Sequence, residues 1–293
     1  MDILSDIKRT FKEGSSLTRL IYINLGVFLV VQIIGVVYFL AGQSNILPDW
    51  LSVPSDVSEI LKRPWTPVTY MFLHTGFIHL LFNILGLYWF GKLFLYRMDG
   101  NKLLSVYLMG GLSGAVFYVI SYNIFPVFES VNGLLLGASA SVFALLVAIA
   151  FYDPNNEIHL SFIGSFQLKY VALFYVLLSV IGISATNPGG NIAHLGGAAW
   201  GWFYIFQLRK GRDMGTGLVK FIDRIAKAIA GLFKPKDNLK VAFKQTPRDD
   251  YEYNRLKNKE QEEMNRILEK IGKAGYDSLS KSEKELLFRQ GKK

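Results

Sequence analysis

Two side chains with the chemistry of a nucleophile and a base stand at the beginnings of two apolar segments. Ser139 lies in Gly-Ala-Ser-Ala-Ser, and His194 lies in Ala-His-Leu-Gly-Gly. Taken alone, Gly-x-Ser is more often a packing motif, but an imidazole at membrane depth is costly and points to function. A neutral imidazole about 3 Å from a serine oxygen can take its proton and activate it. The pattern predicts that Ser139 is a nucleophile and His194 its general base.

A third apolar segment carries His79 and Asn83, four residues apart and so on one helical face. Acyl transfer develops a negatively charged oxygen, and each fixed donor near it contributes about 10²–10³ in rate. We expect the His79 imidazole, the Asn83 amide and the backbone N–H of Ser139 to supply these donors. The alternative is that Asn83 only joins helices and His79 only lies at an interface. The outer halves of these segments hold no Asp or Glu that could orient the His194 imidazole. Ser139 and His194 would therefore act as a dyad and not as part of a triad.

Six apolar segments are long enough to position these residues within a bilayer, which needs about 20 helical residues per crossing. The fourth is short, so we expect it to be central and to follow non-helical chain at membrane depth. The sequence therefore predicts an all-α membrane protein with six transmembrane helices in a membrane domain at 20–208. The segments are Leu20–Leu40, Phe77–Phe94, Leu103–Ile124, Ser139–Phe151, Leu168–Ile183 and Ile192–Leu208.

Loop charge sets the predicted orientation. Basic residues precede the first segment, within residues 1–19, and follow the sixth, whereas the third-to-fourth and fifth-to-sixth connections contain no Lys or Arg. By the positive-inside rule both termini are cytoplasmic. On this topology Ser139, His194, His79 and Asn83 all face the outer side of the membrane.

The chain continues into a basic tail at 209–293. Its 22 basic and 13 acidic residues account for the whole formal charge of +9. Residues 216–233 predict an amphipathic helix on the inner leaflet, where anionic headgroups are the expected counter-charge and nucleic acid is not expected. Residues 251–290 predict a small helical hairpin, broken at Gly275 and with Ser280 and Glu283 as a capping box. The cytoplasmic partner of this hairpin is not indicated by the sequence.

At its candidate site the chain resembles the rhomboid family of intramembrane serine proteases. The matching motifs are His79-Leu80-Leu81-Phe82-Asn83, Gly137-Ala138-Ser139 and Ala193-His194-x-x-Gly197-x-x-x-Gly201. The resemblance implies a six-helix bundle with a water-filled, outward-open cavity and a first loop at 41–66 partly embedded in the leaflet. It also implies cofactor-free hydrolysis through an acyl-enzyme on Ser139. Substrates would be single-span membrane proteins that enter past the fifth helix.

Four further residues would support this site, namely Gly137, Phe143, Gly197 and Gly201. The last two form a small-xxx-small face that would let the His194 helix approach the Ser139 helix closely. Phe143 stands where the family commonly has a Tyr stacked on the histidine, and Ala140 where it usually has Gly. The family's Trp-Arg pair before the second helix is not evident, with Pro64-Trp65-Thr66-Pro67 near its place.

Other classes of protein fit the sequence less well. A catalytically weak or inactive relative that binds transmembrane helices as a scaffold or chaperone would not need Ser139, His194, His79 and Asn83 together. A transporter or channel would show inverted repeats or charged residues along a pore. The chain has no Cys and no His-Glu-x-x-His zinc motif, so we expect no metal. We expect a multi-pass protein of the bacterial cytoplasmic membrane.

Overall fold

The computed structural model describes residues 3–160, 164–185, 187–215 and 250–280, with Gly217, Arg224 and residues 282–284. The amphipathic helix predicted at 216–233 lies outside the described residues, apart from Gly217 and Arg224, as does the end of the predicted hairpin. The chain divides into two compact units, Met1–Leu232 and Phe233–Lys293, each described by itself.

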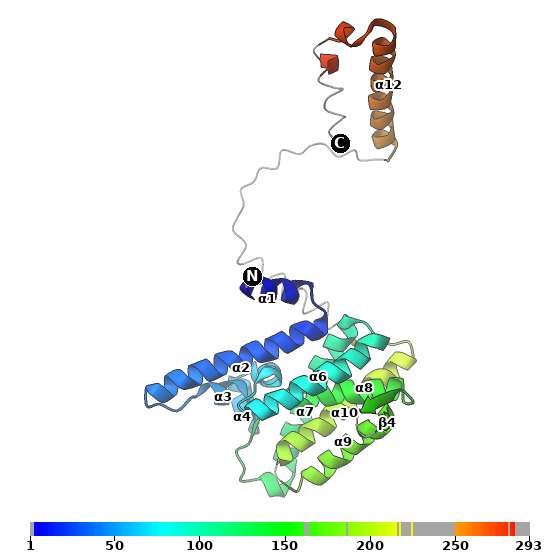
Figure 1. The fold of residues 1–293 in the computed structure, drawn as a ribbon. Helices are drawn as coiled ribbons and strands as arrows, with labels where there is room; N and C mark the ends of the chain where they lie inside the picture. The colour runs from blue at the N-terminus through cyan, green and yellow to red at the C-terminus, as the bar shows by residue number, and fades with distance from the viewer. Residues whose placement is uncertain are drawn as a thin grey trace. The chain divides into compact units, whose positions relative to one another are not determined.

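The first unit is a bundle of helices (Figure 1). Three helices, α2, α6 and α7, are long and apolar enough to cross a membrane, and α8 and α9 are shorter apolar helices. The helices of the bundle are α1 (Ile3–Glu13), α2 (Ser16–Leu40), α6 (Phe77–Arg97), α7 (Gly100–Ile124), α8 (Ser139–Tyr152), α9 (Leu168–Gly182) and α10 (Pro188–Arg209).

Three helices begin earlier than hydropathy predicts because polar residues cap them. Helix α2 begins at Ser16, since the Ser15 side chain accepts a hydrogen bond from the Thr18 N–H. Helix α10 begins at Pro188, before the apolar run, since the Asn187 side chain accepts a hydrogen bond from the Gly190 N–H. Helix α7 begins at Gly100 because the Asp99 carboxylate accepts from two N–H groups of its first turn. Such caps satisfy backbone donors that have no partner within the helix.

Helix α8 is the centre of the bundle, as its short length predicts. Ten of its 14 residues are buried, on all sides of the helix. Small residues on its neighbours permit this close packing. A Cβ added at Gly110 of α7 would overlap the Ala144 methyl group, and one at Gly201 of α10 would overlap the Ala144 carbonyl oxygen. Close approach of backbones is what small residues provide in membrane helices.

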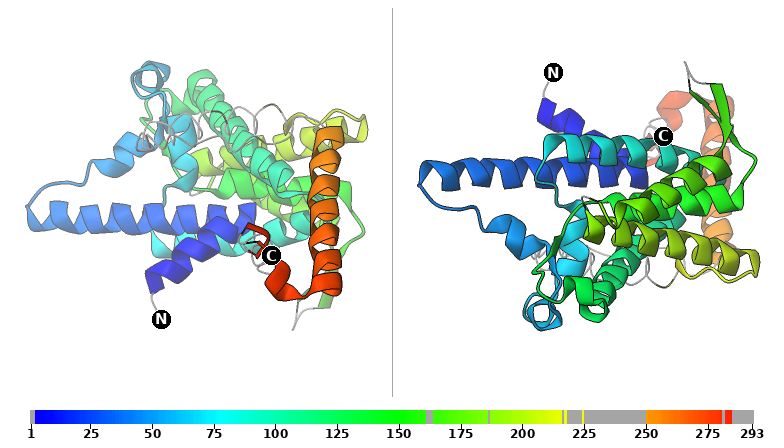
Figure 2. Two further views of the ribbon diagram at one scale, coloured as in Figure 1. Left: turned by 90° about the horizontal axis from the view of Figure 1, so that it is seen from above. Right: turned by 90° about the horizontal axis from the view of Figure 1, so that it is seen from below.

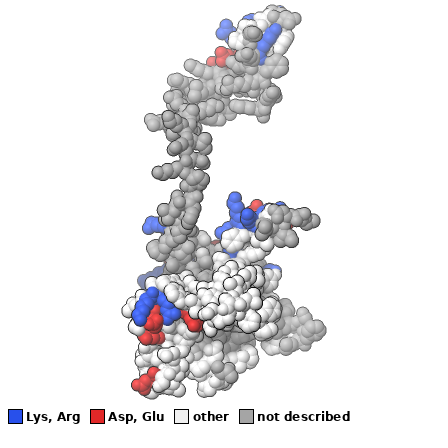
Figure 3. All heavy atoms as spheres, turned by 90° about the vertical axis from the view of Figure 1, so that its left-hand side faces the viewer, with Lys and Arg blue, Asp and Glu red and all other residues white. Residues whose placement is uncertain are grey.

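Helix α2 lies at the edge of the bundle. Seen from above and below, its C-terminal part runs out beyond the other helices (Figure 2). Its buried residues are Leu17, Leu20, Asn24 and Val31, and large apolar side chains are exposed along the rest of the helix. On the face of the unit drawn in Figure 3, charged side chains gather in a few places and most of the described surface is uncharged. This surface suits contact with lipid.

The loop between α2 and α6 is a structured insertion. It contains the short helices α3 (Leu47–Leu51), α4 (Val57–Lys62) and α5 (Thr66–Thr69), the 3₁₀ turn η1 (Tyr70–Phe72) and strand β1 (Val53–Pro54). Strand β1 pairs antiparallel with β2 (Leu134–Leu135), directly before the Ser139 helix. A second pair, β3 (Glu157–Leu160) with β4 (Gly164–Gln167), joins α8 to α9. The unit is mostly helical as predicted, but the sequence did not predict these two small sheets.

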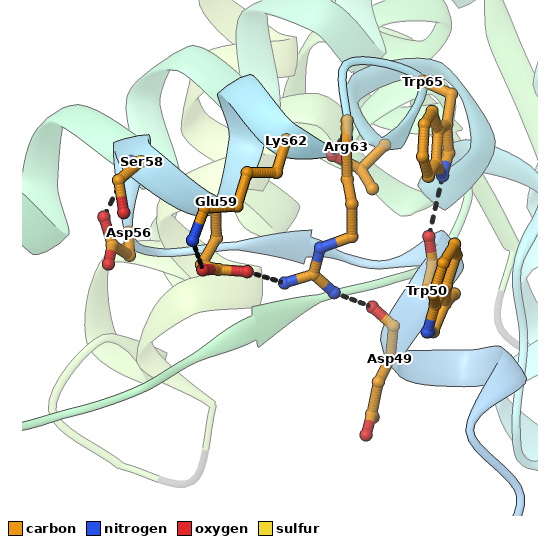
Figure 4. A network of polar contacts seen from close by, with 9 residues as sticks. Asp49, Trp50, Asp56, Ser58, Glu59, Lys62, Arg63 and Trp65 are labelled. Atoms are coloured by element: carbon orange, nitrogen blue, oxygen red, sulfur yellow. Dashed lines mark hydrogen bonds and ion pairs between the residues drawn. The ribbon is translucent and has the colours of Figure 1, made fainter.

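Polar contacts brace this loop (Figure 4). The Arg63 guanidinium donates to the Asp49 carbonyl oxygen at 2.8 Å and to the Glu59 carboxylate at 2.9 Å. The Trp65 indole N–H donates to the Trp50 carbonyl oxygen, and the two indole rings stack. The family's adjacent Trp-Arg pair is not evident in this sequence. In this loop Arg63 lies two residues before Trp65.

The described part of the second unit is one helix followed by a turn. Helix α12 (Asp250–Ala274) ends at Gly275, which has a φ of 77° and is followed by η3 (Tyr276–Ser278). The break predicted at Gly275 is confirmed. The predicted capping box is also present, because the Ser280 N–H donates to the Glu283 carboxylate and the Glu283 N–H to the Ser280 hydroxyl. The Ser280 N–H and Lys270 lower the pKa of Glu283 to about 2.

Candidate active site

Ser139 is the first residue of α8, directly after a tight turn. Gly137 has a φ of 116°, and its N–H donates to the Tyr70 carbonyl oxygen at 2.9 Å. A side chain at Gly137 would also overlap the His79 imidazole. The first N–H groups of an α-helix have no acceptor within the helix, and Ser139 carries the first of these groups in α8.

His194 lies in the second turn of α10, and its Nε2 is 2.8 Å from the Ser139 hydroxyl oxygen. The close approach of α10 to α8 makes this distance possible. A Cβ added at Gly197, three residues after His194, would overlap the Ala140 carbonyl oxygen. The two helices therefore meet backbone to backbone beside the Ser139–His194 contact.

Two more side chains hold the His194 ring. The Phe143 ring, one turn after Ser139, stacks on the imidazole with centroids 4.2 Å apart and planes 12° from parallel. The Ser179 hydroxyl of α9 is 3.2 Å from the other imidazole nitrogen, Nδ1. Sequence reasoning missed Ser179, because one serine in an apolar segment has the composition of ordinary helix packing.

His79 and Asn83 lie on α6, on the other side of the turn that contains Gly137. The His79 ring is close to Gly137, and the Asn83 side-chain amide donates to the His79 carbonyl oxygen at 2.9 Å. Asn83 is buried, with 6% of its surface exposed. The His79 ring is thus the polar group that α6 brings to the turn before Ser139, and the contact of Asn83 lies within α6.

His74, which precedes α6, also contacts the residues around Ser139. The residue is fully buried, and its Nε2 accepts a long hydrogen bond of 3.4 Å from the Ala138 N–H. Its ring lies edge-on to His79, with centroids 5.0 Å apart. His74 therefore contacts the turn that precedes Ser139.

Ala140 stands where glycine was expected, and the bundle accommodates its methyl group. Ala140 is buried, and a Cβ added at Gly114 of α7 would lie 2.6 Å from the Ala140 methyl carbon. The missing side chain at Gly114 provides the space that Ala140 fills. Ser141, the other serine of the motif, is fully buried, and no hydrogen-bond partner is found for its hydroxyl among the described residues.

Comparison with known proteins agrees with this fold. Residues 61–211 match the family described as Rhomboid domain, and residues 249–293 match a family of unknown function, DUF6576. The chain is 30% identical over 162 residues to RHOMBOID-like protein 12, mitochondrial, of Arabidopsis thaliana, which covers 51% of this chain and 48% of that protein. It is 29% identical over 149 residues to Rhomboid protease GlpG of Serratia proteamaculans, covering 44% and 52%. It is 27% identical over 171 residues to Rhomboid protease GluP of Bacillus subtilis, covering 58% and 31%.

These matches define the class of the molecule, an integral membrane protein built on a rhomboid domain. The chain belongs to the rhomboid family, as its three motifs indicate. It spans about half the length of RHOMBOID-like proteins 12 and 7 and of the Serratia protease GlpG.

Proposed function

We propose that this protein is an intramembrane serine endopeptidase that hydrolyses peptide bonds in or near transmembrane segments of membrane proteins. The observation that carries the proposal is the 2.8 Å contact between the Ser139 hydroxyl oxygen and His194 Nε2. This is the separation that a general base needs in order to take the proton of a nucleophile. The family relation and the relatives named as proteases support the same activity.

The reaction divides into two acyl transfers. Ser139 Oγ attacks the carbonyl carbon of the scissile peptide bond while its proton passes to His194 Nε2. The tetrahedral intermediate collapses, the C–N bond breaks, and the leaving amine takes the proton from His194. A water molecule then attacks the Ser139 ester, giving its proton to His194, and the released Ser139 oxygen takes that proton back. The products are an amine and a carboxylic acid, and no cofactor is consumed.

The negative oxygen of each tetrahedral intermediate needs donors fixed before the reaction. We assign these donors to the N–H of Ser139 and to the His79 and Asn83 side chains. The turn at Gly137 and the long His74 hydrogen bond support the N–H, and α6 supports the two side chains. We assign supporting roles to Phe143, which holds the imidazole plane, and to Gly197 and Gly201, which let α10 approach α8.

We further infer that α2, α6, α7, α8, α9 and α10 make six membrane crossings, with both termini in the cytoplasm. Loop charge supports this topology. The matched bacterial relatives support a bacterial cytoplasmic membrane. Single-span membrane proteins would enter beside α9, whose outer face is apolar and exposed. The basic tail at 209–293 would lie against anionic headgroups and meet a cytoplasmic partner.

The decisive experiment compares Ser139→Ala and His194→Ala with wild type in proteoliposomes that contain a fluorescent transmembrane substrate. Ser141→Ala is the matched control, since Ser141 is a buried serine of the same motif. We expect cleavage to disappear in the first two variants and to persist in the control. A fluorophosphonate should label wild type and Ser141→Ala but not Ser139→Ala. Cleavage that survives Ser139→Ala would refute the assignment, and wild-type protein that binds helices without cleaving or being labelled would identify a scaffold.

A further inference from the structure

Ser179 is a buried polar residue on a helix that is otherwise mostly apolar. Helix α9 buries Leu168, Ala172 and Ser179, and its other long apolar side chains are largely exposed. In a membrane helix the hydroxyl group of a serine commonly donates a hydrogen bond to the carbonyl oxygen four residues earlier. Ser179 does so, donating to the Tyr175 carbonyl oxygen at 3.1 Å.

That bond favours one direction for the contact with His194. A serine hydroxyl has a single proton, and the proton of Ser179 is used on Tyr175. With its proton on the Tyr175 carbonyl oxygen, the Ser179 oxygen is placed to accept from His194 Nδ1, 3.2 Å away. It follows that Nδ1 carries the proton of the neutral imidazole, and that Nε2 presents its lone pair to Ser139.

We propose that Ser179 is a positioning residue that holds His194 in the tautomer needed to accept the proton of Ser139. The proposal rests on the proposed protease function and adds a third polar group to the Ser139–His194 pair. Hydrogen bonds to the second nitrogen of a catalytic or metal-binding histidine set its tautomer in the same way. The Ser179 hydroxyl of α9 lies beside Nδ1 of the histidine, where a catalytic triad has an Asp carboxylate.

The consequence for the reaction follows from the alternative tautomer. Without an acceptor at Nδ1, the proton can move to Nε2, where it points at Ser139 and prevents that nitrogen from acting as a base. A buried Nδ1–H without a partner is also disfavoured relative to one that is hydrogen-bonded. Loss of Ser179 should therefore lower the rate of the chemical step and leave substrate binding unchanged.

The test compares Ser179→Ala, Ser179→Thr and the matched control Ser184→Ala. Thr can bond the carbonyl three or four residues earlier in a helix and keeps the hydroxyl. Ser184, near the end of α9, is exposed and donates only to the Ile181 carbonyl oxygen. We expect Ser179→Ala to lower kcat and fluorophosphonate labelling about tenfold, the factor for one neutral hydrogen bond, with KM unchanged. Ser179→Thr should recover most of the rate, and Ser184→Ala should equal wild type.

A spectroscopic readout separates positioning from a structural role. The chain has four histidines, so ¹⁵N-histidine spectra of the full-length protein in lipid nanodiscs are simple enough to assign with the His194→Ala variant. We expect a protonated Nδ1 and an unprotonated Nε2 for His194 in wild type, and a shift of the proton toward Nε2 in Ser179→Ala. Thermal unfolding checks that each variant is folded.

Three results would overturn the proposal. They are a wild-type His194 protonated at Nε2, a Ser179→Ala variant with wild-type labelling and kcat, and a loss that Thr does not recover in a folded protein. A wild-type protein that neither cleaves nor is labelled would instead refute the proposed function, while the tautomer measurement would still report on Ser179.

Discussion

Replacement of Gly197 by alanine tests whether the contact between α8 and α10 sets the geometry of the site. A Cβ at Gly197 would overlap the Ala140 carbonyl oxygen and lie 2.8 Å from its carbonyl carbon. Both atoms are backbone and cannot rotate away. The carbonyl oxygen would lie 2.0 Å from the added Cβ, and real Cβ atoms essentially never come within 3.0 Å of another atom, so the helices must separate by about 1 Å. The 2.8 Å contact between Ser139 and His194 would then lengthen to about 3.8 Å, which is beyond hydrogen-bond distance.

We expect Gly197→Ala to lower the free energy of unfolding by about 1–3 kcal/mol, as overpacking does, although alanine favours helix by about 1 kcal/mol. Cleavage should fall by about 10²-fold, the cost of an error near 1 Å in catalytic geometry. Gly201→Ala overlaps the Ala144 carbonyl oxygen one turn further from the site, so it should destabilise with a smaller loss of activity. Gly26→Ala on α2 is the control, since nothing lies within 4 Å of its added Cβ.

The assay measures thermal unfolding and transmembrane-substrate cleavage for all three glycine variants in the same lipid. A Gly197→Ala protein with the stability and activity of Gly26→Ala would refute the reasoning. It would mean that α10 can move away from α8 without disturbing His194.

Three further predictions concern the surroundings of Ser139 and the outer loop. Gly137→Ala should abolish fluorophosphonate labelling, because the residue has a φ of 116° and adjoins the His79 ring. Ala140→Gly should keep cleavage but lower the free energy of unfolding by about 1–2 kcal/mol in a melting experiment, because the methyl group fills the space at Gly114. Hydrogen bonding by Lys62 holds the pKa of Glu59 below its usual 4.5. The ionised carboxylate therefore stabilises the folded loop above pH 4.5, and this stabilisation is lost as the pH falls through the lowered pKa. Limited proteolysis of the loop should therefore speed up in acid for wild type, and Glu59→Gln should reduce this change.

The helical plan of the membrane domain could be predicted because it depends on local patterns. Long apolar runs predict α2, α6 and α7, and the short run that begins at Ser139 predicts a central helix with packed neighbours. Glycines four residues apart, at Gly197 and Gly201, predict close approach of a second helix. Each of these inferences uses residues that are near one another in the chain.

The remaining features depend on residues far apart in the chain. Strands β1 and β2 have two residues each, too short for an alternating pattern, and they pair across about 80 residues. Gly114 compensates for Ala140, but neither residue alone indicates the other. Ser179 looks like a packing serine until α9 is placed beside His194. These features follow from tertiary contacts, which hydropathy and spacing do not specify.

The proposed nucleophile and the proposed base are supported by different parts of the bundle, and this has a consequence for mutagenesis. Ser139 depends on buried structure, namely the Gly137 turn, the Tyr70 carbonyl and the central helix α8. The second nitrogen of His194 depends on Ser179, on a helix that buries few side chains. Removing a group from the packed centre costs stability and activity together, because the packing cannot relax around the change. Removing the Ser179 hydroxyl leaves the centre intact, so activity should fall with little loss of stability.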